Sequence, residues 1–154
     1  MFPVAAVRRT RVGVARRMAA RDFQLTKTCI VSIVDDDASV REAIEDLVSS
    51  LGMVACTFES AEDFLNSHKV DDTTCLITDE QMPGMKGHEL QRHLRAHGHG
   101  MPIIFITAFP EKCGYDRNEQ SGMIALLEKP FDGGTLVNYL RDAVAAGCRA
   151  TGRC

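Results

Sequence analysis

The amino-acid sequence predicts an α/β fold in which helices cover both faces of a doubly wound, five-stranded parallel sheet. One observation is that short apolar runs, typical of strands buried on both faces, alternate with segments of helical periodicity between residues 28 and 146. Another is that a helical segment separates each run from the next, and right-handed crossovers between parallel strands leave few other arrangements. In addition, acidic residues or a lysine directly follow three of the runs. We therefore expect these polar residues to gather at one edge of the sheet.

The five predicted strands are short. They are expected at residues 29–34, 53–58, 74–78, 103–107 and 124–128. The clearest is Cys29-Ile-Val-Ser-Ile-Val34, because a continuous run of β-branched residues is typical of a strand that is covered on both faces.

The first two helices are predicted from an apolar stripe and from a capping pattern. The stripe ends at Gly52 and consists of Val40, Ile44, Leu47, Val48 and Leu51. Ser60 and Asp63 form a variant of the capping box, which indicates that a short second helix begins there.

Three further helices are predicted in the second half of the chain. The third helix contains Leu90 and Leu94 and ends near Gly98, and the fourth is expected within residues 110–121, which are polar and only weakly periodic. Asp132 can cap the last helix. The apolar residues of that helix stand at four-residue spacing: Leu136, Leu140 and Val144.

Length and charge limit the class of protein. With 154 residues, 45% of them hydrophobic, the chain is long enough for one domain, expected at residues 28–146 with a short tail at 147–154. Residues 1–27 hold seven arginines and lysines against one aspartate, a net charge of +6. Because the whole chain has a net charge of −3, the remaining residues carry a net charge of −9. An acidic domain argues against binding nucleic acid by itself. No apolar stretch is long enough to span a membrane.

The basic segment 1–27 is expected to be a disordered extension, although an arginine-rich, acid-poor start also fits a transit peptide. The six cysteines form no Cys-x-x-Cys pair. We expect reduced thiols in the cytoplasm, with Cys148 and Cys154 as free thiols near the end of the chain.

Carboxylates follow two of the predicted strands. Asp35 and Asp36 come after the first strand and Asp79 after the third. Two carboxylates about 4 Å apart repel by about 4 kcal/mol at an effective dielectric constant near 20, so such a cluster takes up protons or binds a cation. Mg²⁺ fits, because it is a small ion that prefers carboxylate and carbonyl oxygens.

A lysine and a threonine end the neighbouring strands. Lys129 follows the fifth strand and Thr107 ends the fourth. A carboxylate beside a bound cation can attack phosphorus, and an ammonium group stabilises the charge of the transition state. The hydroxyl of Thr107 can donate a hydrogen bond to a phosphoryl oxygen. The pattern therefore predicts a site for phosphoryl transfer.

At these residues the chain, from about residue 28 to residue 144, resembles the receiver domain of two-component response regulators, in particular the receiver half of nitrogen-fixation-type regulators. The motifs that carry the resemblance are Asp35-Asp36, Thr78-Asp79-Glu80-Gln81-Met82-Pro83-Gly84, Thr107-Ala108 and Lys129-Pro130-Phe131. The resemblance implies the strand order 2-1-3-4-5 and a cis bond before Pro130.

The resemblance also implies roles. Asp79 is the expected phosphoacceptor, with Lys129 and Thr107 acting on the phosphoryl group. Asp35, Asp36, Asp79 and the main-chain carbonyl of Gln81 are the expected Mg²⁺ ligands. Two residues depart from the family pattern: Leu126 stands where an aromatic residue is usual, and Glu80 stands where an apolar residue is usual. Glu80 adds a negative charge beside Asp79 and could change the affinity for Mg²⁺.

The function we expect is phosphorelay signalling by a stand-alone receiver that is not an enzyme. A histidine kinase or a histidine phosphotransfer protein would donate the phosphoryl group to Asp79. The face formed by the fourth helix, the fifth strand and the fifth helix would then meet an unknown downstream protein, or a second copy in a homodimer.

Two alternatives remain open. Asp35-x-Asp37-x-Ser39 resembles the motif of haloacid-dehalogenase-like phosphohydrolases, with Asp35 as nucleophile, whereas our main interpretation makes Asp37 a helix cap. The second alternative is a degenerate receiver that docks to a partner without being phosphorylated.

The histidines offer a further pattern. His93 and His97 stand four residues apart on a predicted helix, a spacing that can bind zinc. Because no third ligand is evident, we expect a solvated pair, and we expect His88 and His99 to be ordinary surface residues.

Overall fold

A five-stranded parallel sheet with the order β2-β1-β3-β4-β5 forms the centre of the protein. The structure is a computed structural model that describes residues 28–112 and 123–151. The strands are β1 (Ile30–Val34), β2 (Val54–Phe58), β3 (Cys75–Asp79), β4 (Ile103–Thr107) and β5 (Met123–Glu128). Both the predicted fold class and the predicted strand order are confirmed, and each predicted strand lies within one residue of the observed one.

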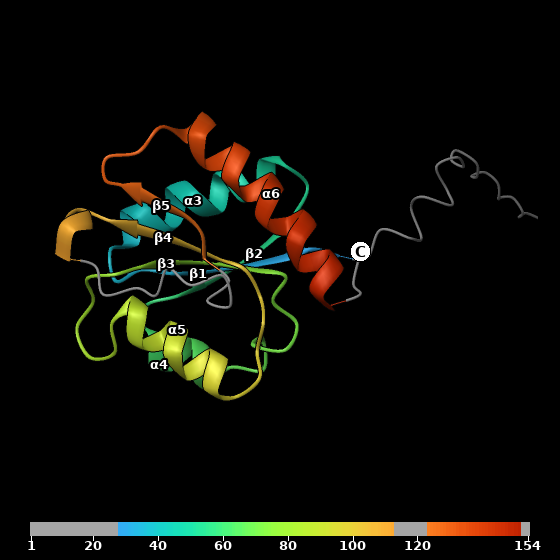
Figure 1. The fold of residues 1–154 in the computed structure, drawn as a ribbon. Helices are drawn as coiled ribbons and strands as arrows, with labels where there is room; N and C mark the ends of the chain where they lie inside the picture. Colours follow the sequence, from blue (N-terminus) through green and yellow to red (C-terminus); the bar gives the residue numbers. More distant parts are fainter. Residues whose placement is uncertain (1–27, 113–122, 152–154) are drawn as a thin grey trace, which may run out of the picture.

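Helices cover both faces of the sheet (Figure 1). They are α3 (Ala38–Ser50), α4 (Ala61–Asn66), α5 (Gly87–Ala96) and α6 (Gly133–Thr151), with a short 3₁₀ helix, η1, at Pro110–Lys112. α3 and α6 lie over one face and α4 and α5 over the other, so two apolar cores form. One core contains Ile44 and Leu140, and the other contains Phe64 and Leu94.

The helix starts follow the predicted caps. The carboxylate of Asp37 accepts a hydrogen bond from the main-chain N–H of Ser39 (2.9 Å), and the hydroxyl of Ser60 accepts one from that of Asp63 (3.0 Å). The carboxylate of Asp132 accepts from the N–H of Thr135 (2.9 Å). Such bonds pair N–H groups that a first helical turn otherwise leaves without a partner.

The C-terminal end of the domain differs from expectation. α6 continues to Thr151, past the expected boundary at residue 146, and Cys148 on this helix forms a disulfide bond. The prediction that Cys148 is a free thiol is therefore wrong, because this residue is disulfide-bonded and also packs against the core. Cys29, Cys56 and Cys75 are not disulfide-bonded. The predictions for residues 1–27, for most of 110–121 and for Cys154 lie outside the described residues.

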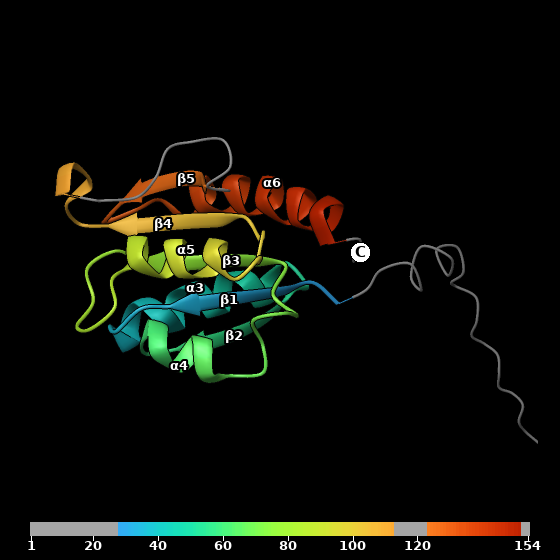
Figure 2. The same cartoon turned by 60° about the horizontal axis from the view of Figure 1, so that its bottom comes forward.

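Within the described part of the chain, no helix is both long and apolar enough to cross a membrane. The strands of the sheet all run in the same direction (Figure 2). The residues that follow β1, β3, β4 and β5 consequently meet at one edge of the sheet, which we call the carboxyl edge.

Candidate functional site

A cluster of two carboxylates and one ammonium group lies at the carboxyl edge. Asp35 follows β1, Asp79 ends the adjacent β3, and Lys129 follows β5. The main-chain N–H of Lys129 donates to the carbonyl of Thr107 (2.8 Å), which extends the pairing of β4 with β5 and aims the lysine across the edge. Strand pairing thus brings together three residues that are far apart in the sequence.

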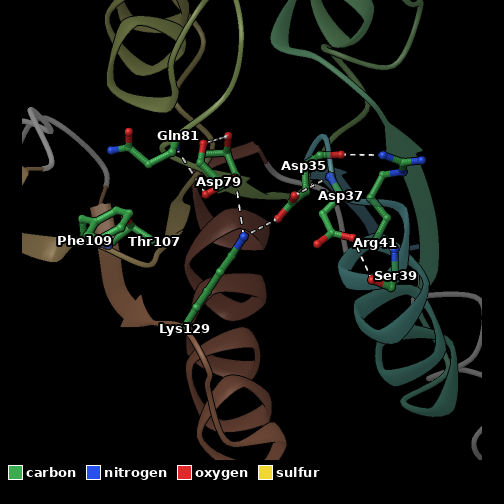
Figure 3. A network of polar contacts seen from close by, with 10 residues as sticks. Asp35, Asp37, Ser39, Arg41, Asp79, Gln81, Thr107, Phe109 and Lys129 are labelled. Atoms are coloured by element: carbon green, nitrogen blue, oxygen red, sulfur yellow. Dashed lines mark hydrogen bonds and ion pairs between the residues drawn. The ribbon is translucent and has the colours of Figure 1, made fainter.

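The ammonium group of Lys129 contacts both carboxylates (Figure 3). Its Nζ lies 3.1 Å from Oδ2 of Asp35 and 3.4 Å from Oδ2 of Asp79. Asp35 is 1% exposed and Asp79 is 4% exposed, so water solvates their charges only in part. The ion pairs with Lys129 neutralise the rest. Buried charges are tolerated only when they are paired and hydrogen-bonded, and both conditions hold here.

Main-chain groups fix the other oxygen of each carboxylate. Oδ1 of Asp35 accepts from the N–H of Asp37 (2.9 Å), and Oδ1 of Asp79 accepts from the N–H of Gln81 (3.3 Å). The guanidinium of Arg41 on α3 donates to the main-chain carbonyl of Asp35 (2.6 Å). The two carboxylates are therefore held in a defined orientation by their own loops.

The acidic residues form a set of ligands for a cation. Oxygens of Asp35, Asp36 and Asp79 all lie within 4.8 Å of one another, and Asp36 is the exposed member. Hard carboxylate oxygens in this number suit Mg²⁺ better than a soft transition metal. The residues present thus fit the predicted ion, whereas a ligand role for the carbonyl of Gln81 stays a prediction.

Burial and charge change the acidity of the site. The pKa of Asp79 is raised to about 6 by burial and by the neighbouring charge of Asp35, although Lys129 acts in the opposite direction. Burial by itself would lower the pKa of Lys129, but the charges of Asp35 and Asp79 outweigh it and raise that pKa. Lys129 therefore remains charged at neutral pH, while part of the repulsion between the two acids persists.

Thr107 lies beside this cluster. Its side chain is fully buried, and its hydroxyl oxygen accepts a hydrogen bond from the main-chain N–H of Phe109 (3.0 Å). Asp79 pairs with Ile106 across β3 and β4, so Thr107 is one residue further along the same edge. Figure 3 shows Thr107 and Phe109 together at the end of the neighbouring strand. A role of this hydroxyl toward a phosphoryl group stays a prediction.

The two departures from the family pattern have different settings. Leu126 is half-buried and packs against the core beneath α4 and α5. Glu80 is 1% exposed, and its carboxylate accepts from the main-chain N–H of His88 (2.8 Å) and pairs with Nδ1 of the same histidine. The expectation that His88 is an ordinary surface residue is therefore wrong, because a buried carboxylate needs a partner and His88 supplies it.

Sequence reasoning missed this pair. A charged residue directly after a buried strand signals that a partner exists, but the sequence does not tell which residue it is. The structure also makes Asp37 the cap of α3, where Ser39 donates to it. The peptide bond between Lys129 and Pro130 is cis, as the resemblance implies.

Most of the chain matches a known protein family. Residues 31–141 match the response regulator receiver domain family. The transcriptional regulatory protein TdiR of Thauera aromatica is 34% identical over 126 residues, which are 80% of this chain and 56% of that protein. The response regulator protein TodT of Pseudomonas putida is 35% identical over 118 residues, 77% of this chain and 52% of that protein. The chain thus spans about half the length of these relatives.

Solved structures show the same fold. A low-resolution structure of the response regulator StyR has a TM-score of 0.74 at 37% identity and covers 80% of this chain and 62% of that one. The crystal structure of FixJ-N has a TM-score of 0.63 at 28% identity and covers 78% of this chain and 96% of that one. Together with the family match and the cluster at the carboxyl edge, these likenesses show that the chain belongs to the response regulator receiver family.

Proposed function

We propose that the domain is a phosphorylation switch in which Asp79 accepts a phosphoryl group while Asp35, Asp36 and Asp79 hold Mg²⁺. Membership of the receiver family supports phosphorelay signalling in a two-component system. The observation that carries the finer proposal is the position of Lys129 Nζ between the carboxylates of Asp35 and Asp79. Asp79 therefore lies beside one cation, the ammonium group of Lys129. It also lies beside Asp35 and Asp36, the carboxylates that would bind a second cation, Mg²⁺.

The residues of the chain have separate tasks in the reaction. A carboxylate oxygen of Asp79 attacks phosphorus, the bond from phosphorus to the donor's imidazole nitrogen breaks, and the leaving imidazole is protonated from solvent. The ammonium group of Lys129 stabilises the negative charge that develops on the phosphoryl oxygens. When bound, Mg²⁺ supplies positive charge between the acids and favours the ionised form of Asp79.

The donor we propose is a histidine kinase or a histidine phosphotransfer protein, since the receiver family implies such a partner. The domain itself is proposed not to be an enzyme beyond assisting its own phosphorylation and dephosphorylation. An unknown downstream protein, or a second copy, is the proposed reader of the phosphorylated state. The expectation of a stand-alone receiver stays a prediction.

The test is incubation of the purified chain with acetyl phosphate and Mg²⁺, followed by intact mass spectrometry. We expect the mass of one phosphoryl group on the wild-type protein and none on Asp79→Asn. Asp37→Asn is the matched control, because Asp37 is an exposed cap of α3, and it should be labelled like the wild type. Absence of label on the wild type, or label that survives Asp79→Asn, would reject the proposal.

Measurements on the same purified protein distinguish the two alternative functions, a degenerate receiver and a phosphohydrolase. A degenerate receiver would show neither label nor binding of Mg²⁺ in a calorimetric titration. A phosphohydrolase would turn over a generic phosphate ester in a manner that depends on Asp35 but not on Asp79. Asp37 caps α3 in the structure, which gives the phosphohydrolase alternative no support.

A further inference from the structure

Three of the five histidines line one hollow at the edge of the sheet opposite the carboxyl edge. The hollow has a volume of about 300 Å³, and its polar lining includes Asp71, His93, His97 and His99. His93 and His97 belong to the end of α5, Asp71 precedes β3, and His99 precedes β4. Because these segments lead into parallel strands, they lie at the amino ends of those strands, away from Asp79.

The rings of the two histidines on α5 lie side by side. The rings of His93 and His97 stack with their centres 4.2 Å apart. Nδ1 of His97 lies 2.8 Å from the main-chain carbonyl of His93. A carbonyl only accepts hydrogen bonds, so Nδ1 carries the proton and the lone pair of His97 is on Nε2. A backbone contact that fixes the tautomer in this way is typical of metal-binding histidines.

His99 provides the third ring. Its Nδ1 lies 3.4 Å from a carboxylate oxygen of Asp71, which leaves Nε2 available for a ligand role. The guanidinium of Arg95 donates to the main-chain carbonyls of His99 (2.7 Å) and Met101 (2.8 Å), so the loop that carries His99 is tied to the last turn of α5. A carboxylate behind a histidine helps to orient its ring toward a ligand.

From these contacts we propose a second metal site, in which His93, His97 and His99 bind a divalent transition metal of the zinc class and Asp71 positions His99. Three imidazole nitrogens prefer zinc, nickel or copper, whereas the carboxylates at the opposite edge prefer Mg²⁺. The two sites would therefore take different ions. The three ring nitrogens are not gathered around one point in the structure, so binding requires side-chain rotations, and all three rings are at least partly exposed.

The binding test uses the full chain without a polyhistidine tag and titrates Zn²⁺ by calorimetry in millimolar Mg²⁺, which competes with Zn²⁺ for the acidic site. We expect one bound Zn²⁺ per chain. Replacing His97 or His99 by alanine should weaken binding at least about tenfold. His68→Ala is the matched control, because His68 is exposed and is not part of the hollow. Asp79→Asn should bind Zn²⁺ like the wild type.

A second measurement guards against misfolded variants. Zn²⁺ should raise the melting temperature of the wild type, His68→Ala and Asp79→Asn proteins but not that of His97→Ala, with circular dichroism confirming that each variant is folded. The proposal is overturned if Zn²⁺ does not bind in the presence of Mg²⁺, or if folded His97→Ala or His99→Ala binds it as tightly as the wild type. Loss of Zn²⁺ binding in Asp79→Asn would assign the ion to the acidic cluster instead and would equally overturn it.

Discussion

At the scale of single residues, the site depends on how one ammonium group is shared between two buried acids. Lys129 contacts both Asp35 and Asp79, and no other lysine or arginine side chain in the described residues forms an ion pair with either of them. Removing it leaves two nearly buried carboxylates facing each other without the cation that neutralises them. The same cation is the group that we assign to the phosphoryl oxygens.

Lys129→Ala should therefore slow phosphorylation of Asp79 by acetyl phosphate about a hundredfold or more, which is the loss typical of removing one charged donor from a transition state. The measurement is the initial rate of labelling at saturating Mg²⁺. Lys69→Ala is the matched control, because Lys69 is exposed and lies before β3, at the other edge of the sheet. A rate for Lys129→Ala within a factor of three of the control would contradict the role proposed.

The acidity of Asp79 gives a pH-dependent prediction for the metal-free protein. Its pKa rises from 3.8 to about 6 on folding, mainly through burial. Between these pH values Asp79 keeps its proton in the folded chain but has released it in the unfolded chain. The contribution of Asp79 to the free energy of unfolding therefore falls as the pH rises from about 4 to about 6, and it is constant above that range. A shift of about two pKa units corresponds to about 3 kcal/mol.

Asp79→Asn lacks this titration. In a chelator, we expect its free energy of unfolding to exceed that of the wild type by about 3 kcal/mol at neutral pH, with the difference shrinking toward zero near pH 4. Urea denaturation of both proteins across this range measures it, and added Mg²⁺ should narrow the gap at neutral pH. If the two proteins differed in their free energy of unfolding by the same amount at pH 4 and at pH 7, the titration of Asp79 would not be the cause of the difference.

At the scale of elements, Glu80 joins the end of β3 to the start of α5. Its main-chain N–H donates to the carbonyl of Ile106 (3.1 Å), and its own carbonyl accepts from Gly87 (3.2 Å). Its carboxylate meanwhile pairs with His88 in the first turn of α5, where helical N–H groups have no partner within the helix. Glu80, at the start of the loop between β3 and α5, thus also binds the residues at the end of that loop.

Glu80→Ala should destabilise the protein by about 1–3 kcal/mol, because it leaves the N–H and the ring of His88 without their buried acceptor. In thermal or urea unfolding, the double variant with His88→Ala should cost less than the sum of the two single variants. Glu42→Ala, at an exposed position on α3, is the control and should change stability little. Strict additivity of the two substitutions would show that Glu80 and His88 do not interact.

At the scale of the whole molecule, the sequence predicts what depends on local pattern and fails where partners must be known. Buried strands such as Ile103–Thr107 and caps such as Asp37 follow from periodicity and from side-chain chemistry within a few residues. The meeting of Asp35, Asp79 and Lys129 follows because parallel strands end at a common edge. The pairing of Glu80 with His88 and the disulfide at Cys148 depend on which residues meet in three dimensions, and spacing alone does not determine that.

The assembly of the acidic cluster from separate strands leads to a prediction for the domain as a whole. Asp35 and Asp79 come together only when β1 and β3 pair, so Mg²⁺ should bind the folded chain and not the unfolded one. A ligand with this preference stabilises by about 2.7 kcal/mol at a hundredfold excess over its dissociation constant. The midpoint of urea unfolding should accordingly rise with the logarithm of the Mg²⁺ concentration. Asp35→Asn should lose most of this dependence, whereas Asp46→Asn, exposed on α3, should keep it. Equal Mg²⁺ dependence in the two variants would place the ion away from the carboxyl edge, since both lose one carboxylate and only Asp35 belongs to the cluster.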